Sequence, residues 1–410
     1  MSRPAVLTLI ACVVGLALSV VPLFITATAA LLMQIAADTA WSRGELSQLI
    51  ATGLCSIAIG TAVVGRLIEA VGARPVILFS TVCFAACLFA FSSVHSFESA
   101  LVLAAITGLF GTGASQFAYL TVLPLWFDRR LGLSLGIAMI GIGLGNALVP
   151  IIMEYLSRSL DWRTIYRSLA GTVMFIGFPN AVFLLRVPER ARKLPSTIGT
   201  PSGNGVTLRE ALCSRIFWQL MLSVSLATTI TAGLGIHLTS LLIDRGYSPA
   251  NAARLFSLWG IALIFARLTG GFLLDKIDVR WLGGGCLIGA GIGATFLALG
   301  VVGPIVIVSV FLVATTHGIE GDLVPYATRE YFGMRAYSTI FGLLGLAFGL
   351  GPVVGSILMG ETFDRSGSYT PMLWAAAATF PIAAFLLIAV GKPLIHGTQQ
   401  SFGYAAGFKH

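Results

Sequence analysis

Four ionisable residues stand inside otherwise apolar stretches of the chain, and they are the first candidates for chemistry. Arg267 lies in the run 264–271, and Glu320 and Asp322 follow His317 in the run 315–322. In a membrane-spanning helix a charged side chain costs about 2.5–3.5 kcal/mol on insertion scales. Arg267 must therefore face water, a counter-ion or a substrate, and its planar guanidinium suits bidentate carboxylate binding. A structural ion pair, or a guanidinium that reaches the membrane surface, is the alternative.

The two acids are predicted to have different partners. Glu320 and Asp322 are two residues apart, which places them about 200° apart around a helix. One can pair with Arg267, and the other can bind and release a proton, because burial favours the neutral carboxyl. His317 lies one turn before Glu320 and is a candidate proton relay. Purely structural roles remain the alternative for all three residues.

Further polar residues in the apolar runs are candidates for lining a binding cavity. Groups of this kind often bond only to the backbone of their own or a neighbouring helix, which is the alternative here. They are Gln116, Tyr119, Asn146, Thr228, Thr229, Thr231 and His237, the last also a possible proton relay.

The composition indicates which elements must position these residues. Of 410 residues, 57% are hydrophobic and 10% charged, whereas a soluble domain has about 25% charged residues. The net charge is +8, and most of the lysines and arginines fall in segments that we place on the cytoplasmic side. This asymmetry is the positive-inside rule, so the basic balance indicates topology and not a nucleic-acid partner.

Several chemistries are excluded by pattern. The six cysteines form no CxxC pair, and Cys83 and Cys87 are one helical turn apart, which is not zinc-ligand spacing. The sequence also has no nucleotide-binding loop and no set of nucleophile, histidine and acid. We expect no metal, no cofactor and no enzyme activity.

The apolar runs predict an all-α membrane protein with twelve transmembrane helices in two six-helix pseudo-symmetric bundles. A Pro-, Gly- and Ser-rich segment separates the halves, giving bundles 1–186 and 216–392, a cytoplasmic linker 187–215 and a cytoplasmic tail 393–410. The predicted spans are 5–34, 46–66, 75–93, 99–124, 132–156, 164–185, 217–241, 251–274, 282–301, 304–327, 338–360 and 371–391.

The two halves repeat in sequence, with several positions sharing one offset of 206 residues. Parallel six-helix repeats place the substrate site between them, near the midplane. The offset carries Gly65, Glu69 and Arg74 onto Gly271, Asp275 and Arg280, and Gly136, Gly143 and Gly145 onto Gly342, Gly349 and Gly351.

The segment Gly65-x-x-x-Glu69-x-x-Gly72-x-Arg74 resembles the loop signature of the major facilitator superfamily, with Glu69 in place of the usual Asp. An acid near a helix end can face the positive N-terminus of a neighbouring helix. The resemblance implies a conformational latch that stabilises one state without touching substrate. Its predicted residues are Gly65, Glu69, Gly72, Arg74, Gly271, Asp275, Arg280, Arg129 and Arg130.

A narrower resemblance is to the monocarboxylate porter group, which includes the oxalate–formate antiporter. It rests on Trp126–Arg130 leading into the glycines of 133–145, on Trp41-Ser42-Arg43, and on Asp161-Trp162-Arg163. The group uses an arginine four residues before a glycine to bind the substrate carboxylate, and Arg267 and Gly271 match that register. The segment Thr26–Ala30 departs from the animal members, so a broader class of organic anion is expected.

The sequence thus predicts a secondary transporter of a small organic carboxylate anion, working by alternating access with proton coupling or anion exchange. We expect a monomer in the lipid bilayer of the cytoplasmic membrane, with both termini cytoplasmic. A multidrug or metabolite efflux transporter of the same fold is the alternative, and a membrane receptor or enzyme is a more distant one. The predicted substrate contacts are Arg267, Gln116, Tyr119, Asn146, Thr229 and His237.

Overall fold

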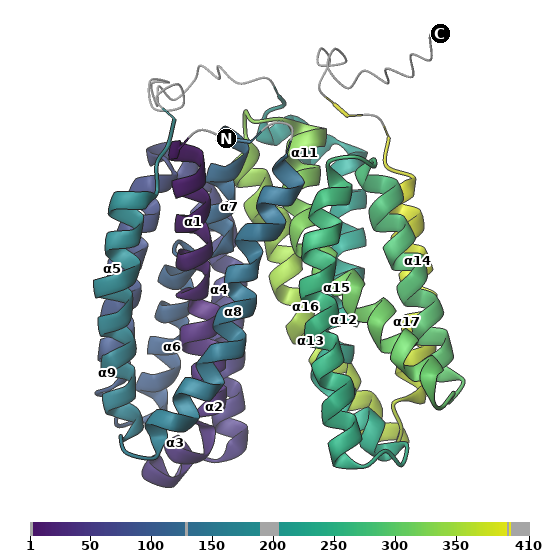
Figure 1. The fold of residues 1–410 in the computed structure, drawn as a ribbon, viewed down its shortest axis with the longest axis horizontal. Helices are drawn as coiled ribbons and strands as arrows, with labels where there is room; N and C mark the ends of the chain where they lie inside the picture. Colours follow the sequence, from purple (N-terminus) through teal and green to yellow (C-terminus); the bar gives the residue numbers. More distant parts are fainter. Residues whose placement is uncertain (1–2, 128–129, 189–204, 392, 395–410) are drawn as a thin grey trace.

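The computed structural model describes residues 3–127, 130–188, 205–391 and 393–394. Within these residues, twelve helices are long and apolar enough to cross a membrane, which confirms the predicted number of spans and the all-α membrane fold (Figure 1). The spans are Arg3–Ala30, Gly44–Val71, Ala73–Phe91, Phe97–Leu125, Leu131–Ser157, Trp162–Leu184, Arg215–Asp244, Ala250–Leu274, Val279–Ala298, Pro304–Phe332, Tyr337–Ser366 and Thr370–Ile388.

Several helices run past the predicted ends of the apolar segments. The seventh, α12 (Arg215–Asp244), was predicted as 217–241, but Ser214 caps it by accepting a hydrogen bond from the Phe217 amide at 3.2 Å. The helices α15 (Pro304–Phe332) and α16 (Tyr337–Ser366) likewise extend past 327 and 360. Polar residues continue each helix beyond its apolar part, so hydropathy located the spans but not their ends.

The first predicted span, 5–34, is too long. The chain forms α1 (Arg3–Ala17), a π-helical segment η1 (Val21–Thr26) and α2 (Ala27–Ala30), and then breaks at Leu31 before α3 (Leu32–Thr39). Pro22, the second residue of η1, has no backbone N–H to donate within the helix, and this favours a local change in hydrogen bonding.

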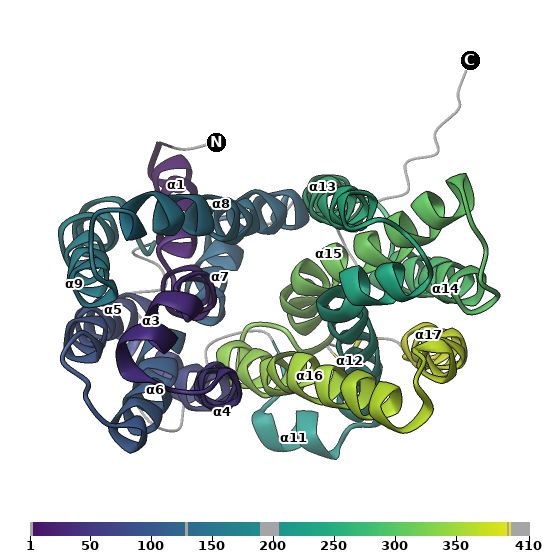
Figure 2. The ribbon, with the colours of Figure 1, turned by 90° about the horizontal axis from the view of Figure 1, so that it is seen from below.

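The remaining helices form two bundles that lie side by side in Figures 1 and 2, with the short α11 beside α16. The linker predicted at 187–215 contains α11; its residues 189–204, and 395–410 of the predicted tail, lie outside the described residues. The first bundle continues with α4 (Arg43–Val71), α5 (Ala73–Phe91), α6 (Phe97–Thr112), α7 (Gln116–Val122), η2 (Leu123–Leu125), α8 (Leu131–Ser157), α9 (Trp162–Thr172), η3 (Val173–Gly177) and η4 (Asn180–Leu184). After α11 (Leu208–Cys213), the second contains α12, α13 (Pro249–Leu274), α14 (Val279–Ala298), α15, α16 and α17 (Thr370–Ile388).

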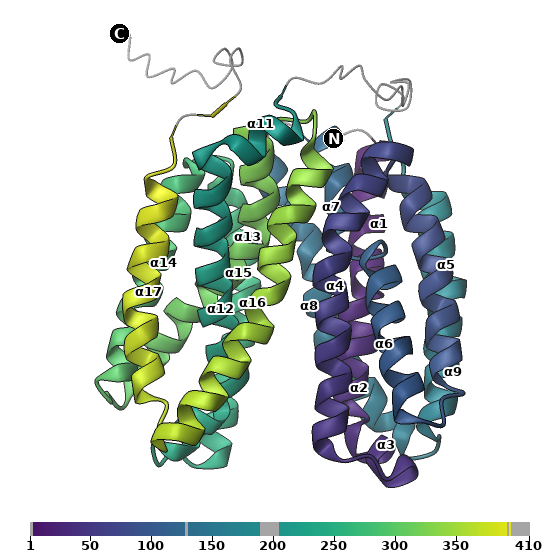
Figure 3. The ribbon, with the colours of Figure 1, turned by 180° about the vertical axis from the view of Figure 1, so that it is seen from behind.

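The two bundles approach each other at the end that carries the N-terminus and α11, and they diverge toward the other end (Figures 1 and 3). At this closed end α4 packs against α16, and α8 packs against α13. The contacts are made by glycines: a Cβ atom on Gly65 would meet the Ser338 carbonyl oxygen, and one on Gly132 would meet that of Gly271. The absent side chains let the backbones touch.

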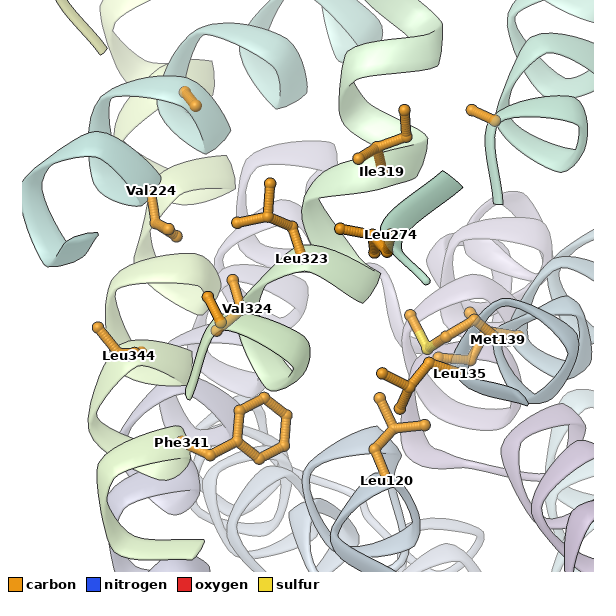
Figure 4. Close-up of a cluster of buried hydrophobic side chains, with 14 of the residues drawn as sticks. Leu120, Leu135, Met139, Val224, Leu274, Ile319, Leu323, Val324, Phe341 and Leu344 are labelled. Carbon is orange, nitrogen blue, oxygen red and sulfur yellow. The ribbon is translucent and has the colours of Figure 1, made fainter. Parts of the chain in front are cut away.

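Buried apolar side chains from both bundles belong to one cluster at the boundary between them (Figure 4). Leu120 and Leu135 come from the first bundle, and Val324 and Phe341 come from the second; each is 5% exposed or less. On α15, the polar residues Glu320 and Asp322 precede Val324 and so lie farther from the closed end than this layer.

Candidate functional site

The Arg267 guanidinium and the Asp322 carboxylate form the central charged pair. Arg267 lies on α13 and Asp322 on α15, and their Nη1 and Oδ1 atoms are 3.7 Å apart. The Asp322 side chain has no exposed surface, and that of Arg267 is 14% exposed. A buried pair of opposite charge is thereby held in the second bundle, at its boundary with the first.

The pair is incompletely hydrogen-bonded. Arg267 Nη1 and both carboxylate oxygens of Asp322 are buried, and the structure gives them no hydrogen-bond partner among the described residues. A separation of 3.7 Å is too long for a hydrogen bond. Buried charges are stable when they are both paired and hydrogen-bonded, so this guanidinium can still bind an anion.

The absence of a side chain at Gly321 leaves room for the Arg267 guanidinium and for the Met139 side chain. A Cβ atom on Gly321 would lie 3.2 Å from Arg267 Nη1 and 3.1 Å from Met139 Cε, so a larger residue there would crowd both side chains. Met139 belongs to α8, which shows that the Arg267 side chain lies at the boundary with the other bundle. On the same helix a Cβ atom on Gly136 would meet the Arg267 carbonyl oxygen.

Glu320 has a separate set of partners. Its Oε2 accepts a hydrogen bond from Thr231 Oγ1 at 3.1 Å and lies 3.7 Å from His317 Nδ1. His317 Nδ1 is also 3.1 Å from Thr231 Oγ1. The two acids of α15 therefore diverge, with Asp322 beside Arg267 and Glu320 beside His317.

The acids of the predicted latch contact the opposite bundle. Asp275, at the end of α13, accepts hydrogen bonds from the Gly132 and Leu133 amides at the start of α8, at 2.8 and 3.1 Å. Glu69, near the end of α4, accepts one from the Thr339 amide at the start of α16, at 2.8 Å. Each acid thus satisfies amides in the first turn of a helix, where the helix dipole favours negative charge.

Burial opposes the Asp275 contact. It raises the pKa of the Asp275 carboxyl, and the hydrogen bonds from Leu133 and Gly132 counteract this only in part. Burial therefore makes the ionised form of Asp275 less favourable than it would be in water.

Of the other predicted latch residues, Gly65 and Gly271 pack against the backbone of the opposite bundle, whereas Gly72, Arg74 and Arg280 have their contacts within their own. Gly72 joins α4 to α5 with φ +91°, a conformation that favours glycine. Arg74 donates to the Val182 carbonyl at 2.7 Å, and Arg280 pairs with Asp278 at 2.6 Å and holds the pKa of that carboxyl below its usual range. Arg130 lies just before α8, and Arg129 is outside the described residues.

Comparison with known proteins decides the family. A model of the Major Facilitator Superfamily matches residues 7–356 and matches again over 244–405. This chain belongs to that superfamily. Members of this superfamily are transporters, so the prediction of a membrane transporter that is not an enzyme is confirmed.

Among the curated relatives of this superfamily member are monocarboxylate transporters, which confirms the resemblance found in the sequence. Monocarboxylate transporter 13 of Rattus norvegicus is 24% identical over 362 residues, covering 86% of this chain and 79% of the relative. Monocarboxylate transporter 11 of Homo sapiens is 26% identical over 380 residues, covering 88% and 76%.

Solved structures of major facilitator proteins share the fold. The E. coli fucose:proton symporter FucP matches with a TM-score of 0.70 at 12% identity, over 95% of this chain and 100% of the other. The human organic anion transporter MFSD10 matches with a TM-score of 0.69 at 14% identity, over 94% and 98%.

Two other residues that were predicted to contact the substrate, Tyr119 and His237, have their contacts elsewhere in this major facilitator protein. Tyr119 is 2% exposed with its ring against Gly15, so it packs inside the first bundle. His237 contacts Tyr369 Oη at 3.2 Å and the Ser356 carbonyl at 3.3 Å, within the second bundle.

Three further candidates are polar residues of α7, α8 and α12. Asn146 is exposed and accepts a hydrogen bond from Thr26 at 3.0 Å, whereas Gln116 and Thr229 are half-buried. Thr228 is fully buried and bonds to its own helix.

Sequence reasoning missed Thr61, although the repeat could have found it. Thr61 Oγ1 donates to the Gly342 carbonyl at 2.7 Å, which joins α4 to α16. The repeat offset carries Thr61 onto Arg267, and it carries Gln116 onto Asp322. In the first half, the two positions equivalent to Arg267 and Asp322 are therefore occupied by neutral polar residues.

Proposed function

We propose that this transporter carries a small organic anion across the cytoplasmic membrane and that Arg267 binds the carboxylate of that anion. The supporting observation is the loose pairing of Arg267 with Asp322, in which Nη1 has no hydrogen-bond partner among the described residues. A substrate carboxylate would supply the missing hydrogen bonds and displace Asp322 from the guanidinium. The names of the monocarboxylate transporter relatives agree with this substrate class.

The first bundle contributes neutral contacts in this proposal. Gln116 is the repeat counterpart of Asp322 and is half-buried at the start of α7. Asn146 lies seven residues after Met139 on α8, which is two turns and about 10 Å along the same face. These amides would bind other polar atoms of the anion, so that the substrate joins the two bundles.

Alternating access completes the mechanism. The Glu69 and Asp275 contacts hold the end with α11 closed, and rotation of the bundles would break them and open that end. We place this end and both termini on the cytoplasmic side, as the distribution of lysine and arginine predicts. Transport would be driven by protons or by exchange of a second anion through Glu320, Asp322 and His317, in a monomer.

Binding of carboxylates to purified protein tests the proposal. A thermal-shift panel of acetate, lactate, pyruvate, succinate and benzoate should include at least one that stabilises the wild-type protein. Arg267→Lys keeps the charge but loses the planar fork, so it should weaken that stabilisation strongly, and Arg267→Ala should remove it. Arg254→Ala, on the same helix, is the control. Wild-type stabilisation in both Arg267 variants would exclude Arg267 from the site.

A further inference from the structure

The Glu320 carboxylate is buried, and only one of its two oxygens has a hydrogen-bond partner among the described residues. Its side chain is 8% exposed, and Oε2 is held by Thr231 and lies beside His317. Oε1 is buried with no hydrogen-bond partner among the described residues. An ionised carboxylate in this position is poorly compensated, since an unsatisfied buried charge is costly.

A small cavity lies beside Glu320, inside the second bundle and away from Arg267. Its volume is about 20 Å³, and apolar residues of α12, α14, α15 and α17 form most of its wall. A cavity needs roughly 10–15 Å³ to hold one water molecule. The cavity therefore has room for a single water next to the carboxyl, but not for a substrate.

The hydroxyl groups in the cavity wall have already donated their protons elsewhere. Ser223 Oγ donates to the Ala383 carbonyl, and Thr316 Oγ1 donates to the Cys286 carbonyl, both at 2.8 Å. These two hydroxyls offer only acceptor lone pairs to the cavity, and the remaining polar group of the wall is the Cys286 thiol, a weak S–H donor. A neutral Glu320 carries no net charge into this mostly apolar wall, so it fits these surroundings better than a carboxylate does.

His317 lies next to the buried Glu320 carboxyl and is itself partly exposed. Its side chain is 26% exposed, whereas that of Glu320 is 8% exposed. Thr231 contacts both residues, at 3.1 Å in each case, so the three groups form a continuous chain. The other titratable group that faces Glu320 is the Cys286 thiol on α14. On α13 the charged neighbour, Arg267, pairs with Asp322, and α12 and α17 supply no charged contact to Glu320 among the described interactions.

We propose that Glu320 is the proton-binding residue of the transporter, that His317 delivers the proton, and that Asp322 serves only as the counter-ion of Arg267. His317 takes a proton from water on one ring nitrogen and releases the Nδ1 proton to Glu320 Oε2, directly or through the Thr231 hydroxyl. The products are a neutral imidazole and a neutral carboxyl. The inference rests on the proposed anion transport for its coupling role, but the protonation of Glu320 can be tested without any substrate.

Infrared difference spectroscopy of the purified full-length protein gives the first test. The stretching band of a neutral carboxyl should be present at neutral pH in the wild type and in Asp322→Asn, and a component of it should be absent in Glu320→Gln. His317→Gln should keep that component but slow its exchange in deuterated buffer. If the band is unchanged in Glu320→Gln, or is lost instead in Asp322→Asn, the assignment to Glu320 is overturned.

Transport in proteoliposomes gives the second test, with a carboxylate from the panel above that the wild type transports. Glu320→Gln should retain exchange of labelled for unlabelled anion but lose accumulation driven by a pH gradient. Glu330→Gln, which changes a half-buried acid of the same helix near the closed end, should retain both. Loss of exchange together with accumulation would overturn the coupling role of Glu320. Failure of the anion proposal would show itself separately, as a wild type that transports no carboxylate while the infrared result stands.

Discussion

The carboxylate of Asp275 reaches across the boundary between the bundles and accepts a hydrogen bond from the amide of Gly132 at 2.8 Å. Arg267, Gly271 and Asp275 follow one another at four-residue intervals on α13, so all three lie near one face of that helix. The proposed anion site and the latch contact are therefore about 12 Å apart on one rigid element. Movement of α13 relative to α8 must change both.

Removal of a latch acid should change transport rate more than substrate affinity. Asp275→Ala deletes two charge-assisted hydrogen bonds, each worth about 1.5–3 kcal/mol, that form only when the end with α11 is closed. The balance between the two states shifts, whereas no contact of the Arg267 side chain is removed. Equilibrium binding and transport rate, measured side by side for Asp275→Ala and Glu69→Ala, check this.

Asp278→Ala is the matched control for the latch, because Asp278 pairs with Arg280 inside its own bundle. It should affect protein stability more than the rate of the conformational change. Lost binding in well-folded Asp275→Ala protein would contradict the latch role.

Enlarging Gly132 should hold the closed end open. A Cβ atom there meets the Gly271 carbonyl oxygen, whereas a Cβ atom on Gly143 of the same helix has nothing within 4 Å. Gly132→Val should therefore increase the distance between spin labels placed at Arg66 and Trp281, and Gly143→Val should not. Equal distances in the two variants would show that the glycine contact does not control closure.

Removing the charge of Asp322 should lower the stability of the anion-free protein. It should also increase the stabilisation that a bound anion gives. Loss of one partner from a buried ion pair typically costs about 3–5 kcal/mol, because the other charge is left uncompensated. A bound carboxylate would then compensate Arg267 without competition. We expect Asp322→Asn to have a lower Tm and a larger carboxylate-induced shift than the wild type. Asp38→Asn, which removes a partly exposed partner of Arg163, serves as the control and should leave the ligand-induced shift unchanged.

The predicted orientation can be tested at a native cysteine. Cys213 is exposed at the end of α11. A membrane-impermeant maleimide should label it only after cells are permeabilised, and the labelling should vanish in Cys213→Ser. Labelling of Cys213 in intact cells would reverse the assigned topology.

Hydropathy and helix geometry predicted more of the fold than of the site. Twelve apolar runs were enough to predict twelve spans, because a helix that crosses a bilayer needs about 20 mostly apolar residues. The two-residue spacing of Glu320 and Asp322 was enough to predict that their side chains lie on different faces of the helix. The repeat also points to Thr61, which occupies the position equivalent to Arg267 and makes its own contact across the boundary.

The rest depends on packing that a single sequence does not display. The break at Leu31 and the π-helical segment before it arise inside an unbroken apolar run. Tyr119 was predicted to contact substrate because it is polar, but its ring fits against Gly15, a neighbour more than a hundred residues earlier in the chain. Neither residue type nor local spacing indicates such a partner.

The two latch acids act on opposite sides of a single boundary, Glu69 from the first bundle and Asp275 from the second. If the bundles rotate as rigid bodies, both contacts must break in the same step, so their free energies add within one activation barrier. Since rate depends exponentially on that barrier, tenfold for about each 1.4 kcal/mol, small changes at either acid would set the turnover of the whole carrier. The repeat would thereby give two distant helix ends joint control of one rate constant.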